Sequence, residues 1–263
     1  MINLIEKSKL IINEFIESEF ESIAVEIESD SGNYTDSING HVQHHAASLL
    51  KVPLAMAVEN EIKCKNINER SKIAISELLE FASQNSVLNG LVDTRNMSIR
   101  EVINLSIISS DESCARYLRS IISTGAIADL LLDIDCLETE IYPNESRYSI
   151  NGKTTALDAL KFIKYGSNLK KYPILSNALA NSITNSRIPI GVDKKFSVQH
   201  KTGTLMGLAH DVAEIKGSAG ILRIACLTSR QSDLIISGLR MGLCVNQLLS
   251  TWDLSASSTI SIL

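Results

Sequence analysis

Residues 47–56 read ASLLKVPLAM, and the interpretation of the 263-residue chain starts from this segment. Ser48 and Lys51 stand three positions apart, so on a helix their side chains share one face and the amine can reach the hydroxyl. A serine hydroxyl is a weak nucleophile by itself, but a desolvated lysine beside another cation can take its proton. The spacing therefore indicates a serine nucleophile at Ser48, with Lys51 beside it.

The setting of this Ser-x-x-Lys pattern matters, because the pattern recurs at residues 167–170 and is usually a solvated helix face. Ser48 begins a long apolar segment directly after a region with strand-like alternation. Its backbone N–H and the helix N-terminus would then face the reacting group. Pro53 lies early in the same segment and predicts an irregular first turn.

Two further motifs follow along the chain. Ser110-Asp111-Glu112 lies in a short break between two predicted helices, and His200-Lys201-Thr202-Gly203-Thr204 ends a predicted strand. Together with Ser-x-x-Lys, and in this order, they resemble the signature of class A β-lactamases and related penicillin-binding proteins. The resemblance runs nearly end to end. The 62 positions from Ser48 to Ser110 are typical of the family, whereas the 91 from Ser110 to Lys201 are few.

The resemblance implies an acyl-enzyme mechanism that needs no cofactor. Ser48 would carry the acyl group, and Lys51 would be its base or part of the proton relay. Ser110 would pass a proton towards the leaving nitrogen.

The Lys-Thr-Gly strand would bind the substrate. Lys201 would set the electrostatics of the site and attract a substrate carboxylate, helped by Thr202 and the adjoining Gly203. The N–H groups of Ser48 and Thr204 would form the oxyanion hole, where one donor is typically worth about 3–4 kcal/mol. His210 stands near where many family members have an arginine for the carboxylate. It either replaces that arginine in a pH-dependent way or is a strand histidine with a backbone partner.

Glu112 departs from the family, which usually has asparagine at this position. An asparagine amide both donates and accepts hydrogen bonds, whereas a glutamate only accepts them and adds charge. We expect a preference for substrates with an amine or cation near this position. The alternative is that Glu112 points into solvent.

The loop that supplies the deacylating water in class A enzymes is the second departure. The family's Glu-x-x-Leu-Asn does not occur, and the matching segment, residues 137–147, reads LETEIYPNESR and is several residues short. Glu145 falls nearest the family's glutamate, Glu138 or Glu140 could serve instead, and each could equally be a solvated loop acid. Without that water, release of the acyl group would be slow.

The predicted fold is α+β, with an antiparallel five-stranded sheet, flanking N- and C-terminal helices and an inserted all-helical domain. Residues 1–45 and 190–263 would form the sheet domain and 46–189 the helical domain, with the active site in the crevice between them. The expected helices cover residues 1–20, 47–64, 73–82, 99–107, 113–122, 155–169, 174–182 and 232–252. The expected strands cover residues 22–29, a second strand after the turn at 30–33, 196–201, 209–216 and 221–228.

Composition excludes several kinds of partner. A net charge of −5 without a basic patch argues against nucleic acid. The histidines at 41, 44 and 45 lack a completing carboxylate or cysteine, so we expect no metal. No glycine-rich phosphate loop is present, which argues against a nucleotide cofactor. Nothing in the sequence requires a partner protein.

Charged residues interrupt every apolar run at the N-terminus, so no secretory signal is expected. No stretch is expected to span a membrane. If Met1 is the natural start, we expect a cytoplasmic protein. Five dispersed cysteines, without Cys-x-x-Cys spacing, fit reduced and mostly buried thiols.

Three functions compete. The first is a hydrolase of β-lactams or related cyclic or peptide amides, hence an antibiotic-resistance enzyme. The second is a cytoplasmic amide or ester hydrolase or acyl-transferase that makes or neutralises a small peptide-like metabolite. The third is a penicillin-binding or receptor-like protein without efficient turnover.

Overall fold

A five-stranded antiparallel sheet organises the chain in the computed structural model, which describes residues 3–81, 86–91, 96–142 and 151–254. Its strand order is β2-β1-β10-β9-β8, so strands from both ends of the chain pair directly. The predicted α+β class with this sheet is confirmed. The strands are β1 (Glu21–Ser29), β2 (Gly32–Ile38), β8 (Ser197–Leu205), β9 (Leu208–Gly217) and β10 (Gly220–Thr228).

The sheet is built from tight hairpins at the places where the sequence has turn residues. β1 and β2 pair from Ser29 with Gly32 onwards, across the predicted turn. β9 and β10 are joined at residues 217–220, where Gly217 pairs with Gly220. Gly220 has a φ of +156°, a conformation that side chains rarely permit, so glycine suits this corner.

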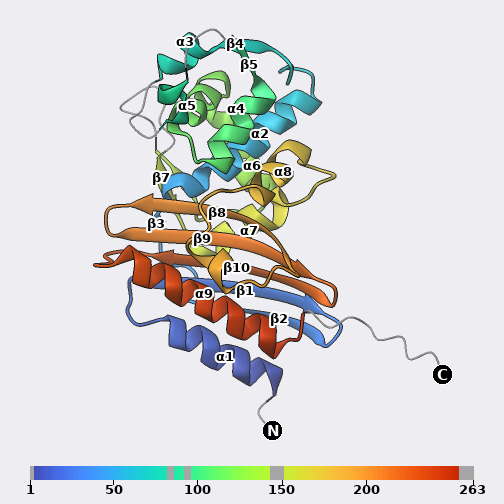
Figure 1. Ribbon diagram of the computed structural model, residues 1–263, viewed down its shortest axis with the longest axis vertical. Coiled ribbons are helices and arrows are strands. Elements are labelled where there is room, and N and C mark those ends of the chain that lie inside the picture. Colours follow the sequence, from blue (N-terminus) through green and yellow to red (C-terminus); the bar gives the residue numbers. More distant parts are fainter. Residues whose placement is uncertain (1–2, 82–85, 92–95, 143–150, 255–263) are drawn as a thin grey trace, which may run out of the picture.

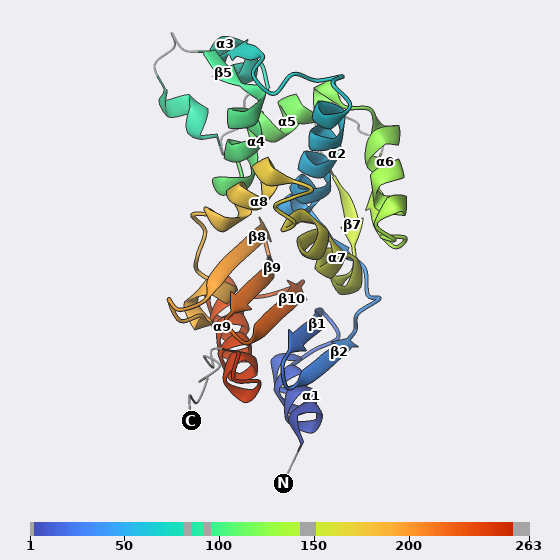
Figure 2. The ribbon, with the colours of Figure 1, turned by 90° about the vertical axis from the view of Figure 1, so that its right-hand side faces the viewer.

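Helices cover both faces of the sheet (Figures 1 and 2). α1 (Leu4–Phe15) and α9 (Leu234–Thr251) lie on one face, with an apolar core that includes Phe15 and Trp252 between them and the strands. The indole N–H of Trp252 donates to the Ser8 hydroxyl at 2.7 Å and ties the two helices together. This pairing explains why helices from opposite ends of the chain form one layer.

The other face carries the helical region, which is built around the buried helix α2 (Lys51–Lys63). Here α7 (Ala156–Gly166) and α8 (Pro173–Ala180) lie nearest the sheet. The remaining elements are η1 (Ala47–Leu50), β3 (His44–His45), β4 (Lys72–Ala74), α3 (Ile75–Leu79), η2 (Val87–Gly90), β5 (Asn96–Ser98), α4 (Ile99–Ile108), α5 (Glu112–Ile121), α6 (Thr124–Asp133), β6 (Glu140–Ile141), β7 (Gly152–Thr154) and η3 (Ile188–Gly191). The predicted domain division at residues 45/46 and 189/190 stays a prediction.

Several elements differ from the sequence-based expectation. The predicted helix at 73–82 is only the short α3, preceded by β4, and α6 was not predicted. β8 continues through Lys-Thr-Gly to Leu205 instead of ending near Lys201. The irregular start expected from Pro53 takes the form of the 3₁₀ turn η1 before α2, which leaves Pro53 in the first turn, where its missing N–H has no partner to lose.

α9 has the length and apolarity of a membrane-crossing segment, with 18 residues and a mean hydropathy of 1.2. One such helix is weak evidence for a span, and 44% of this window is buried inside the fold. The described residues thus contain one marginal candidate and no clear membrane-crossing helix. All five cysteines are unpaired thiols, of which Cys64 is exposed and the others are buried.

Candidate active site

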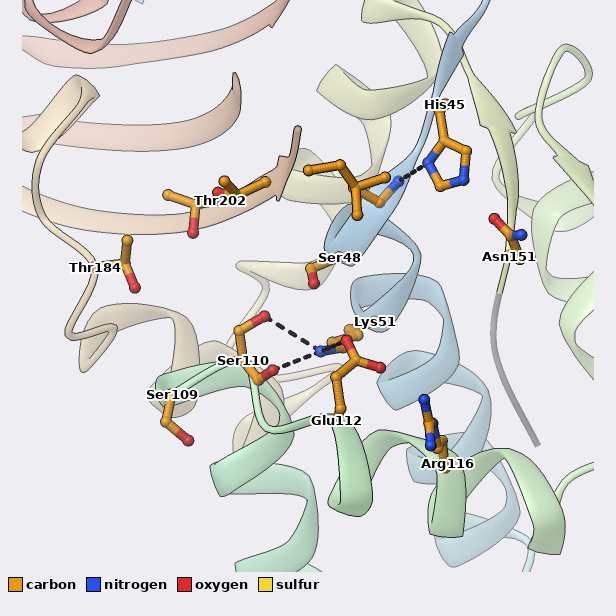
Figure 3. A pocket seen from close by; sticks show the side chains of 13 residues that line it. His45, Ser48, Lys51, Ser109, Ser110, Glu112, Arg116, Asn151, Thr184 and Thr202 are labelled. Carbon is orange, nitrogen blue, oxygen red and sulfur yellow. Dashed lines mark hydrogen bonds and ion pairs between the residues drawn. The ribbon is translucent and has the colours of Figure 1, made fainter. Parts of the chain in front are cut away.

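A cavity of about 510 Å³ lies where the start of α2, the loop before α5 and the strand β8 meet (Figure 3). Its walls contain hydroxyls, an amine, a carboxylate and a guanidinium group. The lining residues are His45, Ala47, Ser48, Lys51, Ser109, Ser110, Glu112, Arg116, Asn151, Thr184, Thr202, Thr204 and Leu205. The cavity thus brings together residues that are more than 150 positions apart in the chain.

Ser48 is held on the 3₁₀ turn η1 at the cavity wall. The preceding backbone is tightly fixed: Ala47 has a φ of +46°, and its N–H donates to Nδ1 of His45 at 3.1 Å. β8 approaches this turn closely, since a Cβ on Gly203 would lie 3.4 Å from both the Ala46 oxygen and the Ala47 Cβ. A glycine at 203 therefore lets the Lys-Thr-Gly strand lie against the residues that position Ser48.

Lys51 is buried at the start of α2, with its side chain 1% exposed. Its Nζ donates to the Ser110 carbonyl oxygen at 2.6 Å, to Glu112 Oε1 at 2.6 Å and to Ser110 Oγ at 3.3 Å. Burial lowers the pKa of Lys51, and the Glu112 carboxylate opposes this shift. Among the hydrogen bonds of the described residues, none joins Lys51 to the Ser48 hydroxyl.

Ser110 occupies a strained position between α4 and α5, with a φ of +56°. The next residue, Asp111, fixes this loop. It is fully buried and caps α5 by accepting a hydrogen bond from the Cys114 N–H at 2.9 Å. Its second oxygen accepts from the Ser86 hydroxyl and the Val87 N–H. These bonds stabilise the backbone turn that presents Ser110 to Lys51.

Lys201 reaches the same serine from β8. Its Nζ donates to Ser110 Oγ at 2.9 Å and to the Thr202 carbonyl oxygen at 2.8 Å. Complete burial and the nearby Lys51 ammonium place the pKa of Lys201 well below its ordinary value. Lys51, Ser110 and Lys201 thus form one hydrogen-bonded chain along which a proton can move.

Thr202 and Thr204 line the cavity, while Arg187 supports β8 from behind. The Arg187 guanidinium donates to the Gly203 carbonyl oxygen at 2.8 Å and to the Thr204 hydroxyl at 2.5 Å. The sequence analysis assigned no role to Arg187, because its contacts with β8 are not visible in sequence spacing. It likewise did not identify as lining residues Asn151, Thr184, Ser109, Arg116 and His45.

His210 is not a wall of the cavity, which corrects its proposed role in binding the substrate carboxylate. It is fully buried, its Nδ1 accepts from the Thr228 N–H at 3.1 Å, and its Nε2 donates to the His45 oxygen at 2.9 Å. Burial lowers its pKa to about 3, so the ring is neutral. The alternative interpretation, a strand histidine with backbone partners, describes this placement.

Glu112 points into the cavity towards Lys51 with a side chain 31% exposed, not freely into solvent. The other acids lie elsewhere. Glu138 contacts Nδ1 of His41 at 2.9 Å, and Glu140 accepts from the Gln43 amide at 3.0 Å; neither lines the cavity. Glu145 lies outside the described residues.

Two other sequence features were considered as sites, namely the histidines at 41, 44 and 45 and the second Ser-x-x-Lys pattern. Groups of three or more histidine, cysteine or acidic side chains that could hold a metal do not occur within the described ranges. His44 instead contacts two hydroxyls, those of Ser22 and Ser229. The second Ser-x-x-Lys pattern begins at Ser167, the residue that ends α7, so its serine and lysine do not share a helix.

Known proteins resemble the chain in sequence and in fold. The sequence model of the beta-lactamase enzyme family matches residues 6–239. Beta-lactamase VEB-1 of Pseudomonas aeruginosa is 24% identical over 219 residues, which make up 77% of this chain and 73% of that protein. The crystal structure of a beta-lactamase from Sphaerobacter thermophilus has a TM-score of 0.80 and 19% identity, with 95% of this chain and 98% of that one covered. The structure of PBP-A has a TM-score of 0.77 and 13% identity, with 94% and 96% covered.

Proposed function

Because the chain belongs to the beta-lactamase enzyme family, we propose that it is a serine hydrolase that forms an acyl-enzyme on Ser48 with a β-lactam or a related cyclic or peptide amide. The observation that carries this proposal is the chain of hydrogen bonds from Lys51 through Ser110 to Lys201 beside Ser48. A structural neighbour, PBP-A, has been crystallised as an acyl-enzyme complex with penicillin G, which supports the same chemistry here.

The proposed reaction uses the cavity residues as follows. Ser48 Oγ attacks the carbonyl carbon while its proton moves to Lys51, which must first be neutral. The N–H groups of Ser48 and Thr204 hold the oxygen that becomes negative. Ser110 then gives a proton to the leaving nitrogen as the carbon–nitrogen bond breaks. Lys201 is buried behind the cavity wall, so in this reaction it acts through Ser110, whose proton it replenishes, while Thr202 on the wall binds a substrate carboxylate.

Time-resolved intact mass spectrometry with benzylpenicillin tests this proposal, with Ser48→Ala as the control. We expect a mass increase of one penicillin on the wild-type protein and none on Ser48→Ala. An adduct that forms and clears while substrate is consumed means a β-lactamase. Failure of the wild-type protein both to gain mass and to consume the penicillin would contradict β-lactam chemistry and leave only the shared family and fold.

Acyl transfer or a slow, penicillin-binding behaviour is the second candidate, and the position of the acids favours it. In the part of the chain that the structure describes, Glu112 is the only carboxylate that lines the cavity, and it is paired with Lys51. An acyl group that water removes slowly would wait for another nucleophile. A small amine or alcohol added to preformed acyl-enzyme should then speed its loss and appear in the product mass.

The substrate of this second function would be a small amide or ester. A role in the synthesis or neutralisation of a peptide-like metabolite would replace one in resistance. Acylation by peptide-like amides but not by penicillins would favour this version.

A further inference from the structure

The ion pair between Lys51 and Glu112 is the feature of the cavity that the proposed acylation step does not explain. An ammonium has three N–H groups, and the three acceptors around Lys51 Nζ are the Ser110 carbonyl oxygen, Ser110 Oγ and Glu112 Oε1. This set leaves no lone pair for the proton of Ser48. This geometry suits the ammonium form of Lys51, in which it cannot act as a base, although burial alone lowers its pKa.

Glu112 is the partner of Lys51 that a substrate can reach. Lys51 is 1% exposed, whereas Glu112 is 31% exposed and lines the cavity beside Ser109 and Ser110. A cation on a bound substrate could therefore contact the Glu112 carboxylate from the open side. It would draw the carboxylate away from Lys51 and add a like charge near the ammonium, and both effects favour loss of the Lys51 proton.

Other charged and titratable groups surround this pair. Asp111 and Cys114 lie on the α5 side, Lys201, Asp211 and Arg187 on the sheet side, and Arg116 and His45 on the cavity wall. Of the nearby acids, Asp111 is fully buried and bound to the Cys114 N–H, the Ser86 hydroxyl and the Val87 N–H. Asp211 is also fully buried and contacts His200. Glu112 is thus the acid that both touches Lys51 and faces the substrate space.

We propose that the ion pair with Glu112 stabilises Lys51 as an ammonium in the free enzyme. Substrates with a cationic group on the acyl side chain break this ion pair and therefore acylate Ser48 preferentially. This inference rests on the proposed acyl-enzyme function and names its substrate class. When the substrate cation pairs with Glu112, Lys51 releases one proton to solvent and becomes the neutral amine. That amine then accepts the proton of Ser48 as the serine oxygen bonds to the carbonyl carbon.

Ampicillin and benzylpenicillin form a matched pair for the test, because they differ by one amine on the acyl side chain. Second-order acylation constants are measured by intact mass for the wild type, for Glu112→Gln and for Glu69→Gln. Glu69→Gln removes the same charge from the Arg100 ion pair, which lies outside the cavity. The amine of ampicillin titrates too, and comparison of variants at one pH removes that contribution.

The wild type and Glu69→Gln should prefer ampicillin, and Glu112→Gln should reduce this preference by roughly tenfold or more, the value of a hydrogen bond to a charged group. With benzylpenicillin, Glu112→Gln should be the faster enzyme at neutral pH. The acid limb of its pH profile should move to lower pH, because loss of the carboxylate destabilises the Lys51 ammonium. A merely structural role would slow both penicillins equally and leave the limb in place.

An unchanged preference, or an unmoved acid limb, in Glu112→Gln would overturn the proposal. If that variant does not fold, Glu112→Asp is used, which keeps the charge on a shorter side chain. It should still weaken the ion pair with Lys51 and raise the rate of acylation by benzylpenicillin. If penicillins label no form of the protein, the proposed β-lactam function fails. The effect of Glu112 on Lys51 is then measured with uncharged phenylmethanesulfonyl fluoride. This reagent should label Ser48 faster in Glu112→Gln than in the wild type, and equal rates would refute the proposed effect of Glu112.

Discussion

The Ser110 hydroxyl is the point at which the two buried lysines meet, at 3.3 Å from Lys51 and 2.9 Å from Lys201. A proton cannot pass between the lysines without it. We therefore expect Ser110→Ala to lower the acylation constant by roughly 100-fold or more, the usual range for a proton-transfer group. Ser109→Ala is the matched control, because this neighbouring hydroxyl also lines the cavity but donates to the Leu105 oxygen and contacts neither lysine among the described residues. Equal losses in the two variants would contradict the relay.

Gly203 allows the close approach of β8 to the turn that carries Ser48. An alanine Cβ there would lie 3.3 Å from the His210 ring, which two hydrogen bonds hold in place. We expect Gly203→Ala to lower the acylation constant roughly tenfold and to cost about 1–3 kcal/mol of unfolding free energy, as overpacking typically does.

Gly90→Ala is the control for this change, because a Cβ there meets no atom within 4 Å. Kinetics with benzylpenicillin and urea unfolding of both variants give the comparison. If Gly203→Ala has the acylation constant and the unfolding free energy of the wild type, there is room for a side chain between β8 and the turn that carries Ser48.

At the scale of residues, sequence spacing predicted which side chains meet but not how they pair. Ser48, Lys51 and Ser110 converge on the cavity, and Lys201 reaches Ser110 from the middle of β8. By contrast, the contact of Glu112 with Lys51 and the burial of His210 depend on tertiary packing. Such contacts leave no periodic pattern in the sequence. The contact of Glu112 with Lys51 was therefore not predicted, and the place of His210 stayed open between two alternatives.

α5 depends on a buried N-cap that also fixes the catalytic loop. Asp111 accepts hydrogen bonds from the Cys114 N–H, the Ser86 hydroxyl and the Val87 N–H. Asp111→Ala should cost roughly 3 kcal/mol of unfolding free energy, because it removes a cap and leaves buried donors unpaired. It should also slow acylation, since Ser110 loses its support.

Asp233→Ala is the matched control for this cap. Asp233 is exposed and caps α9 by accepting from the Ile235 and Ile236 N–H groups. Its loss should cost only about 1 kcal/mol and leave acylation unchanged. Denaturant unfolding of both variants measures the difference, and similar costs would mean that burial of Asp111 adds nothing.

At the scale of elements, strong periodicity and turn residues predicted the hairpins and the long helices. The errors have physical reasons. α6 was missed because Gly125, a poor helix former, lies in its first turn and weakens the signal. β8 runs four residues beyond Lys201 because pairing with β9 outweighs the polar, glycine-containing sequence.

At the scale of the whole molecule, the candidate site lies between two hydrophobic cores. One core fills the helical region around α2, and a second fills the space between the sheet and the helices α1 and α9. The order of helices and strands along the sequence was enough to predict the α+β class and its antiparallel five-stranded sheet, whereas the division into two domains stays a prediction. The shape and lining of the crevice were not predictable, because they depend on how the two units pack together.

Acid stability should depend on two histidines buried beneath the site, His44 and His210. Burial lowers the pKa of His44 to about 4 and that of His210 to about 3, against an ordinary value of 6.5. Below pH 6.5 the unfolded chain therefore binds protons that the folded protein does not. Each histidine should remove up to roughly 1.4 kcal/mol of stability per pH unit as the pH falls from 6.5 towards its folded pKa.

Two buried acids act in the opposite direction at lower pH, because burial raises the pKa values of Glu59 and Asp158. A variant comparison isolates the histidine contribution. His44→Gln keeps a polar group between the Ser22 and Ser229 hydroxyls but cannot gain a proton. Urea unfolding at pH 7.0, 6.0 and 5.0 should show a shallower decline for His44→Gln than for wild type, by about 1 kcal/mol per pH unit. Parallel declines would mean that His44 takes up its proton in the folded protein, so that the hydroxyl pair around its ring does not keep it neutral.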